Sequence, residues 1–459
     1  MTTMRVGSRG FVAAFGDMLL RRQTLIRRAQ WVIISAYVLL LAVPLLLPLP
    51  RSGDFIWNNL SRFAQFAFWG IWWPFVVLAT ALVGRFWCGL LCPEGALSEF
   101  ASERGAGRAI PSWMKWSGWP VVSFIATTVY GQLTSIYQYP KPAALLLGGS
   151  TFAAMIVGAR YGKSKRVWCR FLCPVSGVFG LVSKIAPFHF QVDPETWRRS
   201  ATTDAPAVNC APLVPIKTMR GASACHMCGR CSGHRGAIRL AWRKPAMDIV
   251  YGSGRMATSW ETILIVPVLL GVVPAALHWS NSAIFQALRQ WLVELCVGAH
   301  WIWPLSLRLP WWVLTNYPSV NDVMTVVDGL CLLALIVVGC FSATILFIGP
   351  LAASSLLLRG RLAIVHHLAQ ALIPLSAASL FAGLLSLTIT QLHADGIVLP
   401  HSDQARAVVV LMSALWSLRM FFGITGIYNK AIGRRIAATA LICIPITLFC
   451  IAWIRAFSS

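Results

Sequence analysis

Long apolar runs separated by short polar loops dominate the chain. Each run approaches the ~20 residues that an α-helix needs to cross a hydrocarbon core of ~30 Å. Nine such runs can be delimited, at residues 30–50, 63–84, 117–137, 142–159, 262–279, 323–349, 362–390, 406–426 and 436–455. The pattern therefore predicts an all-α polytopic membrane protein with about nine transmembrane helices.

One Trp-rich region, residues 284–320, does not fit the pattern of a full crossing. Pro304, Pro310 and Pro318 interrupt it. Indole rings settle at the depth of the lipid head groups. We expect this region to form an interfacial or re-entrant element on the outer face.

Composition and charge place the chain in a membrane. Hydrophobic residues make up 57% of the sequence and charged residues only 12%, whereas charged residues approach a quarter of a soluble domain. The net charge of +24 comes from Lys and Arg in the loops, as in the cytoplasmic loops of membrane proteins. A basic groove interleaved with exposed aromatic residues is missing, so nucleic acid is not an expected partner.

The same charges predict an orientation. Six arginines, including Arg5 and Arg9, precede the first apolar run. This run lacks an Ala-x-Ala cleavage site, so it is expected to be a retained first helix. We expect the N-terminus, Arg359 and Arg361 on the cytoplasmic side of a bacterial inner membrane, and the C-terminus outside.

Three domains follow from this organisation. Residues 1–186 form an N-terminal membrane domain of four helices, and residues 261–459 form a C-terminal helical membrane domain. Between them, residues 187–260 are polar enough to form a small cytoplasmic domain.

Eight of the thirteen cysteines fall in tight groups. The other five lie mostly in apolar runs, where a free Cys usually packs as a small buried hydrophobe. These five are Cys296, Cys331, Cys340, Cys443 and Cys450.

The polar domain carries a ferredoxin-type motif. It reads Cys225-His-Met-Cys228-Gly-Arg-Cys231, in which three thiolates can wrap one cubane. In bacterial ferredoxins a fourth Cys follows and ligates a second cluster, but this chain has Arg235 there. Cys210, fifteen residues before Cys225, can supply the missing ligand. We therefore predict a ferredoxin-like domain with one [4Fe–4S] cluster, held by Cys210, Cys225, Cys228 and Cys231.

Other uses of these thiols stay open. Four cysteines can hold structural zinc, although zinc sites usually pair two Cys-x-x-Cys knuckles. Disulfides are not expected on a reducing cytoplasmic face. His226 and His234 could serve as ligands, but exposed polar histidines beside a cluster are the commoner case.

A second set of thiols belongs to an internal repeat. The two copies read Arg85-Phe-Trp-Cys88-Gly-Leu-Leu-Cys92-Pro and Arg166-Val-Trp-Cys169-Arg-Phe-Leu-Cys173-Pro. Residues four apart share a helix face, so each copy is expected to present two thiols to one side. The four thiols could form one metal site or redox-active dithiols, since a Cys near a helix N-terminus has a lowered pKa. Packing of a repeated fold is the alternative.

The paired Cys-x-x-x-Cys-Pro hairpins, followed by a ferredoxin segment, resemble a family of membrane iron–sulfur proteins. This family includes the quinol-oxidising subunit of periplasmic nitrate reductase systems, the nitrous-oxide reductase maturation and regulatory protein, and the copper-reducing assembly factor of cbb3 oxidase. The resemblance covers about residues 30–260. It implies that cytoplasmic or quinol electrons are coupled to redox work at or beyond the membrane, often to mature a metalloenzyme.

Two features depart from this family. Relatives commonly carry two cubanes, whereas this chain keeps cysteines for one. The second half resembles none of the family's accessory domains. There His366 or His367 could line a quinone pocket. Haem is not expected, because adjacent histidines on a helix point about 100° apart.

These observations predict a membrane-bound electron-transfer protein, which would be an oxidoreductase if it acts as an enzyme. Quinol or a cytoplasmic donor would reduce the cluster, and a redox partner protein would receive the electrons. A copper-handling maturation factor with thiol ligands is the first alternative. A transporter with a regulatory cluster is the second.

Overall fold

A computed structural model of the protein describes residues 10–51, 53–200, 207–219, 221–280, 282–359 and 362–458. Arg5, Arg9 and Arg361 lie outside these ranges. Eight helices in the described ranges are long and apolar enough to cross a membrane: Gln23–Leu46, Leu60–Val83, Pro140–Tyr161, Ser259–Leu277, Val326–Arg359, Val365–Ala394, Ser402–Tyr428 and Ile432–Phe457. The predicted class, an all-α polytopic membrane protein, is confirmed.

The ninth predicted run is helical but short. Residues 117–137 contain α7, Trp119–Leu133, which has 15 residues. At 1.5 Å per residue this helix is roughly 22 Å long, less than the ~30 Å core. The count of helices that meet the length of a full crossing is therefore eight, one fewer than predicted, over the residues that the structure describes.

The Trp-rich region, residues 284–320, contributes no candidate span, and its interfacial or re-entrant role stays a prediction. It folds into α16 (Ala283–Gly298) and α17 (Trp303–Ser306), followed by β3 (Asn316–Tyr317) and β4 (Asp322–Val323). The two short strands pair antiparallel.

The chain divides into two compact units, and the three predicted domains remain a prediction. Unit 1 comprises Met1–Val38, Leu78–Trp119 and Ser150–Ser253. Unit 2 comprises Leu39–Val77, Pro120–Gly149 and Gly254–Ser459. All eight clustered cysteines belong to unit 1.

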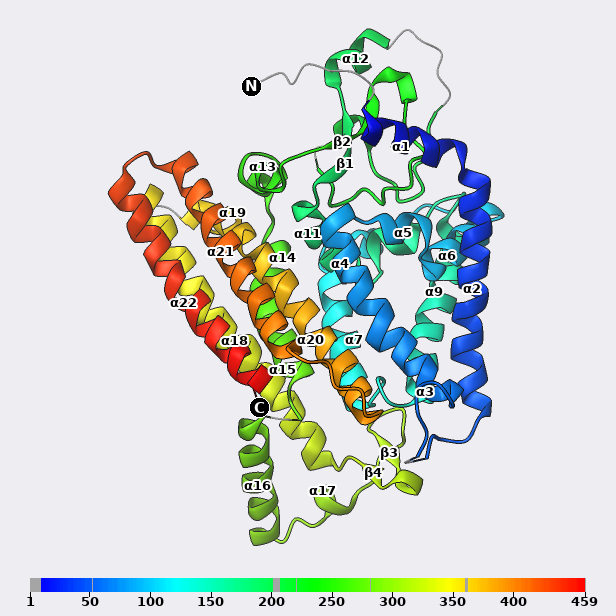
Figure 1. Ribbon diagram of the computed structural model, residues 1–459, viewed down its shortest axis with the longest axis vertical. Coiled ribbons are helices and arrows are strands. Elements are labelled where there is room, and N and C mark those ends of the chain that lie inside the picture. Colours follow the sequence, from blue (N-terminus) through cyan, green and yellow to red (C-terminus); the bar gives the residue numbers. More distant parts are fainter. Residues whose placement is uncertain are drawn as a thin grey trace. The chain divides into compact units, whose positions relative to one another are not determined.

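Unit 1 contains a small antiparallel sheet. Strands β1 (Phe188–Val192) and β2 (Ile238–Trp242) pair with Phe190 opposite Leu240. Helix α1 (Phe11–Arg21) packs on β2 (Figure 1). A Cβ at Gly16 would lie 2.9 Å from the Cβ of Leu240, so α1 needs glycine at this contact. The sequence reading had assigned no structure to this N-terminal segment.

The hairpins of unit 1 are positioned by helices that pack at very short range. Helix α6 (Pro93–Glu103) follows the first hairpin, and α9 (Gly149–Tyr161) precedes the second. The hydroxyl of Ser98 on α6 donates to the Ala154 carbonyl on α9 at 3.0 Å. A Cβ at Gly158 would lie 2.3 Å from the Ser98 carbonyl oxygen. Glycine at position 158 therefore sets the distance between the two hairpins.

Unit 2 is a bundle of long helices. Helices α18 (Val326–Arg359), α20 (Ile373–Ala394), α21 (Ser402–Tyr428) and α22 (Ile432–Ser458) run along one another (Figure 1). The buried carboxylate of Asp395, just after α20, pairs with Arg62 at 2.6 Å.

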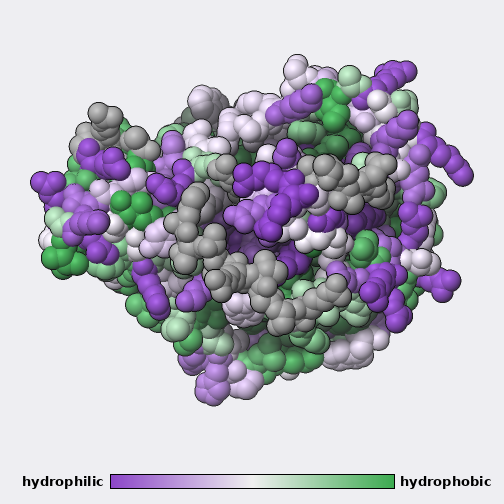
Figure 2. Space-filling model, turned by 90° about the horizontal axis from the view of Figure 1, so that it is seen from above, coloured by the Kyte–Doolittle hydropathy of each residue, from purple (hydrophilic) through white to green (hydrophobic). Residues whose placement is uncertain are grey.

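The end of the molecule that carries α1 and α12 (Pro194–Arg199) is polar. Figure 2 views the protein from this end and shows hydrophilic residues in extended patches. Unit 1 contributes exposed basic side chains, namely Lys163, Arg198, Arg199, Lys217 and Lys244.

The α6–α9 contact generates a test with two glycines of the same helix. Gly158→Ala should cost about 1–3 kcal/mol, because the new methyl group meets a backbone oxygen that cannot move freely. Gly149→Ala is the control, since a Cβ there meets nothing within 4 Å and alanine favours helix by up to about 1 kcal/mol. We expect the apparent melting temperature of the full chain in detergent to fall for the first variant only. Equal melting temperatures of the Gly158 and Gly149 variants would contradict the close packing of α6 against α9.

Candidate iron–sulfur site

The two hairpin copies share one backbone conformation. Helix α5 (Phe86–Leu90) follows Arg85, and α10 (Val167–Phe171) follows Arg166. Each is five residues long. The internal repeat predicted from the sequence is thus present in the structure.

The two copies also end in the same way. The amide of Cys92 donates to the Trp87 carbonyl at 2.9 Å, and that of Cys173 to the Trp168 carbonyl at 3.0 Å. Each hydrogen bond closes the turn that brings the second Cys of the pair back beside the first.

The origin of each thiol pair differs from our expectation. Cys88 lies in α5, but α5 ends at Leu90, so Cys92 does not share its helix face. Cys92 is instead the N-cap of α6, and its Sγ accepts the Gly95 amide at 3.4 Å. The thiols of Cys88 and Cys92 are therefore not on one helix face. The turn after α5 and the N-cap position of α6 determine where Cys92 lies.

The four hairpin thiols converge with one carboxyl group. Cys173 interacts electrostatically with Cys169, Cys92 and Cys88, and also with Glu94. A Cβ at Gly95 would lie 3.5 Å from the Cys169 sulfur, so glycine there makes room for the second hairpin. The two thiol pairs, which the sequence analysis suggested could form one site, therefore lie near enough to interact electrostatically.

The electrostatics of these thiols contradict one of our premises. The redox-dithiol alternative assumed a thiol pKa lowered by a helix N-terminus. Burial instead raises the pKa of Cys169 to about 12, against the opposing influence of Arg166. Burial also raises the pKa of Cys92 and Cys173. Uncoordinated, these thiols are protonated at neutral pH, because desolvation penalises the thiolate.

Glu94 is the feature of this group that the sequence reading missed. Burial raises its pKa to about 7, although the Trp168 and Ser150 side chains favour the carboxylate. The second copy has Val175 at the equivalent position after its Cys-Pro pair. The carboxyl group therefore belongs to only one half of the repeat.

The ferredoxin-type cysteines all lie in the connection between β1 and β2. Cys231 interacts electrostatically with Cys225, Cys228 and Cys210. Cys210 therefore lies near enough to the other three for electrostatic interaction, and the ligand set itself stays a prediction. Cys225 also packs in a core with Phe190 and Leu240.

The backbone of this connection suits a cluster. Met227 and Gly229, on either side of Cys228, adopt left-handed conformations, with φ of 56° and 76°. The Met227 amide donates to the Cys225 sulfur at 3.4 Å, and hydrogen bonds to cysteine sulfur are one means of tuning an iron–sulfur cluster. Burial raises the pKa of Cys225 to about 12, so metal binding must displace its proton.

Within the described ranges, no three or more Cys, His, Asp or Glu side chains gather closely enough to hold a single metal ion.

The two thiol sets are in direct backbone contact. A Cβ at Gly89 would lie 1.9 Å from the His226 carbonyl oxygen and 3.0 Å from the Cys228 nitrogen. Gly89 follows the first Cys of its hairpin, and the second copy has Arg170 at this position. Arg170 interacts electrostatically with Cys210. Gly89 of the first hairpin therefore allows the ferredoxin-type loop to approach closely. Arg170 of the second hairpin places a positive charge near this loop.

Both hairpins also hold the loop by hydrogen bonds. The guanidinium of Arg85 donates to the Ser223 carbonyl at 2.9 Å, two residues before Cys225. The backbone amide of Arg166 donates to the Ala211 carbonyl at 2.8 Å, next to Cys210. The two equivalent arginines thus hold this segment at two points, next to Cys210 and shortly before Cys225.

Glu99 on α6 joins these parts through two ion pairs. Its carboxylate accepts from Arg166 Nε at 2.8 Å and from Arg230 Nη1 at 2.5 Å. Arg166 also donates to the Cys88 carbonyl at 2.5 Å. Burial would raise the pKa of Glu99, but the two arginines outweigh burial and lower it. A single carboxylate therefore connects both hairpins to the Cys228–Cys231 segment.

The histidines differ in their surroundings. His226 is only 2% exposed, so the expectation of an exposed polar histidine is wrong for this residue. His234 is half-buried beside Trp197. In unit 2, His366 Nδ1 lies 2.9 Å from the Thr262 hydroxyl and His367 Nδ1 lies 2.8 Å from the Tyr428 hydroxyl. The adjacent histidines contact different helices.

Comparison with known proteins identifies the repeat. A family described as a 4Fe-4S binding domain matches residues 65–111 and 146–192, which contain the two hairpins. The chain is also 22% identical to the "Putative electron transport protein YccM" of Escherichia coli (strain K12), over 260 residues that make up 49% of this chain and 70% of that protein. No solved structure matches.

These matches support an iron–sulfur cluster and a relation to iron–sulfur electron-transfer proteins. The matched residues end at 192, before Cys210. The assignment of the cluster to Cys210, Cys225, Cys228 and Cys231 therefore stays a prediction that rests on the motif and on the local geometry.

Gly89 provides the sharpest test of the contact between the thiol sets. Gly89→Ala should displace the His226–Cys228 backbone, because its Cβ would otherwise overlap a carbonyl oxygen. We expect less iron per chain and faster proteolysis between residues 207 and 237. Gly433→Ala is the control, since a Cβ there meets nothing within 4 Å. Iron content and cleavage rates equal to those of the wild type in the Gly89 variant would refute the contact.

Proposed function

We propose that this protein is a membrane-bound electron-transfer protein that holds one [4Fe–4S] cluster through Cys210, Cys225, Cys228 and Cys231. Such a cluster, when bound, accepts and releases one electron at a time. The similarity to an electron transport protein supports this function, and the 4Fe-4S domain match supports the cofactor.

The direct contact between Gly89 and the Cys225–Cys228 loop carries the proposal. Through this contact the first hairpin lies against the backbone of the segment that carries three of the proposed cluster ligands. The rate of electron transfer falls steeply with distance. Electrons could therefore pass between the proposed cluster and the hairpin that contacts its ligand segment. The hairpins are then the exit or entry point for electrons rather than a separate packing motif.

Positive charge around the ligand loop serves the same function. The Lys165 ammonium donates a hydrogen bond to the Cys210 carbonyl at 3.1 Å. The positive charge of Arg170 also interacts electrostatically with Cys210. Four thiolates around a cluster carry net negative charge, which nearby cations stabilise in a low-dielectric site. These two residues would favour the reduced, more negative state.

The donor is proposed to be quinol or a cytoplasmic reductant, and the acceptor a metalloenzyme or its maturation pathway. The resemblance to quinol-linked membrane proteins supports this direction. Basic loops support a cytoplasmic position for the N-terminus and the ferredoxin-like segment in a bacterial inner membrane.

A metal-handling maturation factor is the second candidate. Cys173 interacts electrostatically with Cys88, Cys92 and Cys169 in a buried environment, which favours this candidate, although in the described residues these thiols do not gather closely enough to hold a single metal ion. Soft thiolate ligands suit Cu(I), and the cluster would then supply electrons to the bound metal.

Iron, acid-labile sulfide and EPR measurements on anaerobically purified protein test the proposal. The wild type should contain about four irons per chain and show the signal of a reduced cubane after dithionite, as expected for one [4Fe–4S] cluster. Cys225→Ser should lose both. Cys296→Ser is the matched control, because Cys296 is a buried cysteine outside both thiol sets.

Hairpin variants separate the two candidates. If Cys88→Ser and Cys173→Ser keep the cluster but block its reduction or reoxidation by the physiological partner, electron transfer is supported. If these variants lose Cu(I) binding while cluster redox chemistry is unchanged, the maturation factor is favoured. Zinc without sulfide in the wild type would rule out the electron-transfer function.

A further inference from the structure

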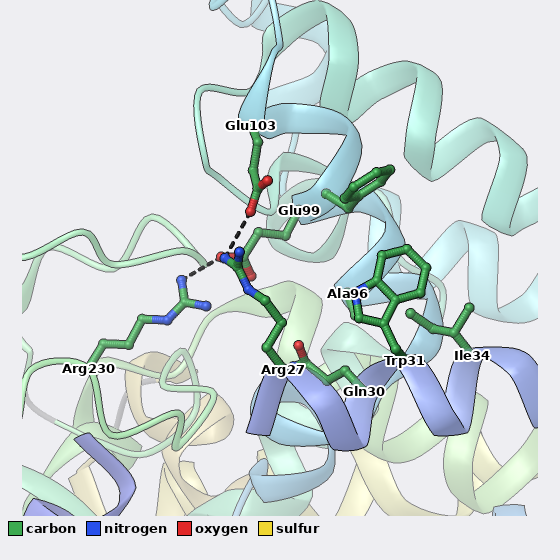
Figure 3. Close-up of a pocket in the computed structure, with 9 residues that line it drawn as sticks. Arg27, Gln30, Trp31, Ile34, Ala96, Glu99, Glu103 and Arg230 are labelled. Carbon is green, nitrogen blue, oxygen red and sulfur yellow. Dashed lines mark hydrogen bonds and ion pairs between the residues drawn. The ribbon is translucent and has the colours of Figure 1, made fainter. Parts of the chain in front are cut away.

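A pocket lies between α2 (Gln23–Leu46) and α6 in unit 1 (Figure 3). Its volume is about 100 Å³. A buried water needs roughly 10–15 Å³ on this measure, so the pocket has room for about one six-membered ring. Ala96 lies on its wall.

The opening of the pocket has the character of a membrane interface. Trp31 on α2 and Phe100 on α6 line it and are 43% and 49% exposed. Their rings meet edge to face, with centroids 5.2 Å apart. Helix α2 is a candidate membrane span, and Trp31 lies in its third turn, where an aromatic side chain typically marks head-group depth. A ligand would enter from the lipid.

The interior offers an unused hydrogen-bonding group. Gln30 is only 9% exposed, and no group in the described residues forms a hydrogen bond with its amide. Figure 3 shows the side chain directed from α2 into the pocket. A side-chain amide both donates and accepts, so it can bind a carbonyl or a hydroxyl oxygen.

The charges around the pocket are balanced. Arg27 pairs with Glu103 at 2.9 Å, and Arg230 pairs with Glu99 at 2.5 Å. Because each guanidinium already faces a carboxylate, the pocket gives little attraction to a phosphate. A neutral ring with polar oxygens fits better than the head group of an anionic phospholipid.

The pocket shares a wall with the proposed cluster loop. Arg230 precedes Cys231 in the chain, and its Nε donates to Gln23 Oε1 at 3.3 Å. The amide of Gln23 in turn donates to the Cys228 carbonyl at 3.0 Å. A ligand in the pocket would therefore lie next to the segment that carries two proposed cluster ligands.

We propose that this pocket binds the ring of a membrane-dissolved quinone or quinol. Gln30 would bind one ring oxygen, while Trp31 and Phe100 would cover the ring. The inference rests on the proposed electron-transfer function, which leaves the donor unplaced, and it assigns the donor a site.

Binding of a short-chain ubiquinone analogue and of menadione to the full chain in nanodiscs tests the site. Ala96→Leu should weaken binding at least tenfold, because the larger side chain fills the pocket. Gln30→Leu, which keeps the volume but removes the amide, should weaken it roughly tenfold, as expected for one lost hydrogen bond to a buried partner. Ala36→Leu is the control, because Ala36 is exposed on the same helix and does not line the pocket.

The outcomes distinguish this inference from the function on which it rests. Cluster-free Cys225→Ser should still bind quinone, since the pocket contains none of the proposed cluster ligands. A wild type with a cluster but no quinone binding would overturn the site and leave the electron-transfer proposal standing. Unchanged binding in the Ala96 and Gln30 variants, or phospholipid recovered from the pocket by native mass spectrometry, would also overturn it.

Discussion

The buried carboxylate of Glu99 is the interaction on which the rest of unit 1 depends. It forms ion pairs with Arg166 of the second hairpin and with Arg230 of the ferredoxin-like loop. Arg166 also donates a hydrogen bond to the Cys88 carbonyl of the first hairpin. Arg166 is only 2% exposed, so without Glu99 its charge would be buried and uncompensated. Removing one partner of such a pair costs about 3–5 kcal/mol. The carboxylate thus joins the two hairpins to the segment that carries Cys228 and Cys231.

The repeat is useful because its two halves are not identical. Both halves contribute an arginine, a Trp carbonyl that closes the turn, and two thiols. They differ where they meet the ferredoxin-like loop, since Gly89 lets the backbone approach and the equivalent Arg170 places a cation near Cys210. A perfectly symmetric pair of hairpins would offer either two close contacts or two cations. Because the hairpins differ, the loop contacts the first hairpin closely at Gly89 and lies near the positive charge of Arg170 in the second. Glu94 is present in the first hairpin only.

The sequence predicted the features that depend on local pattern. Apolar run length identified the spans, and the repeated Cys-x-x-x-Cys-Pro pattern identified the two hairpins, whereas the ligand role of Cys225, Cys228 and Cys231 remains a prediction. The sequence could not reveal Glu99, because an acidic residue on a short polar helix resembles any solvated Glu until its two arginines, 67 and 131 residues away, are brought to it. The same limit applies to Gln30, to α1 and to the buried state of His226. The lowered thiol pKa assumed by the redox-dithiol alternative is not found, because burial raises the pKa of Cys92, Cys169 and Cys173.

Hydrogen–deuterium exchange of Glu99→Gln in the full chain tests the central claim most directly. Glu103→Gln is the matched control, because its ion pair with Arg27 is largely exposed and such pairs contribute little. If Glu99 joins the thiol sets, the Glu99 variant exchanges faster than the wild type both in residues 221–237 and in residues 85–92. The control variant exchanges at the wild-type rate in both segments. Exchange that is unchanged in both segments, or that rises equally in the two variants, would contradict the claim that Glu99 joins the thiol sets.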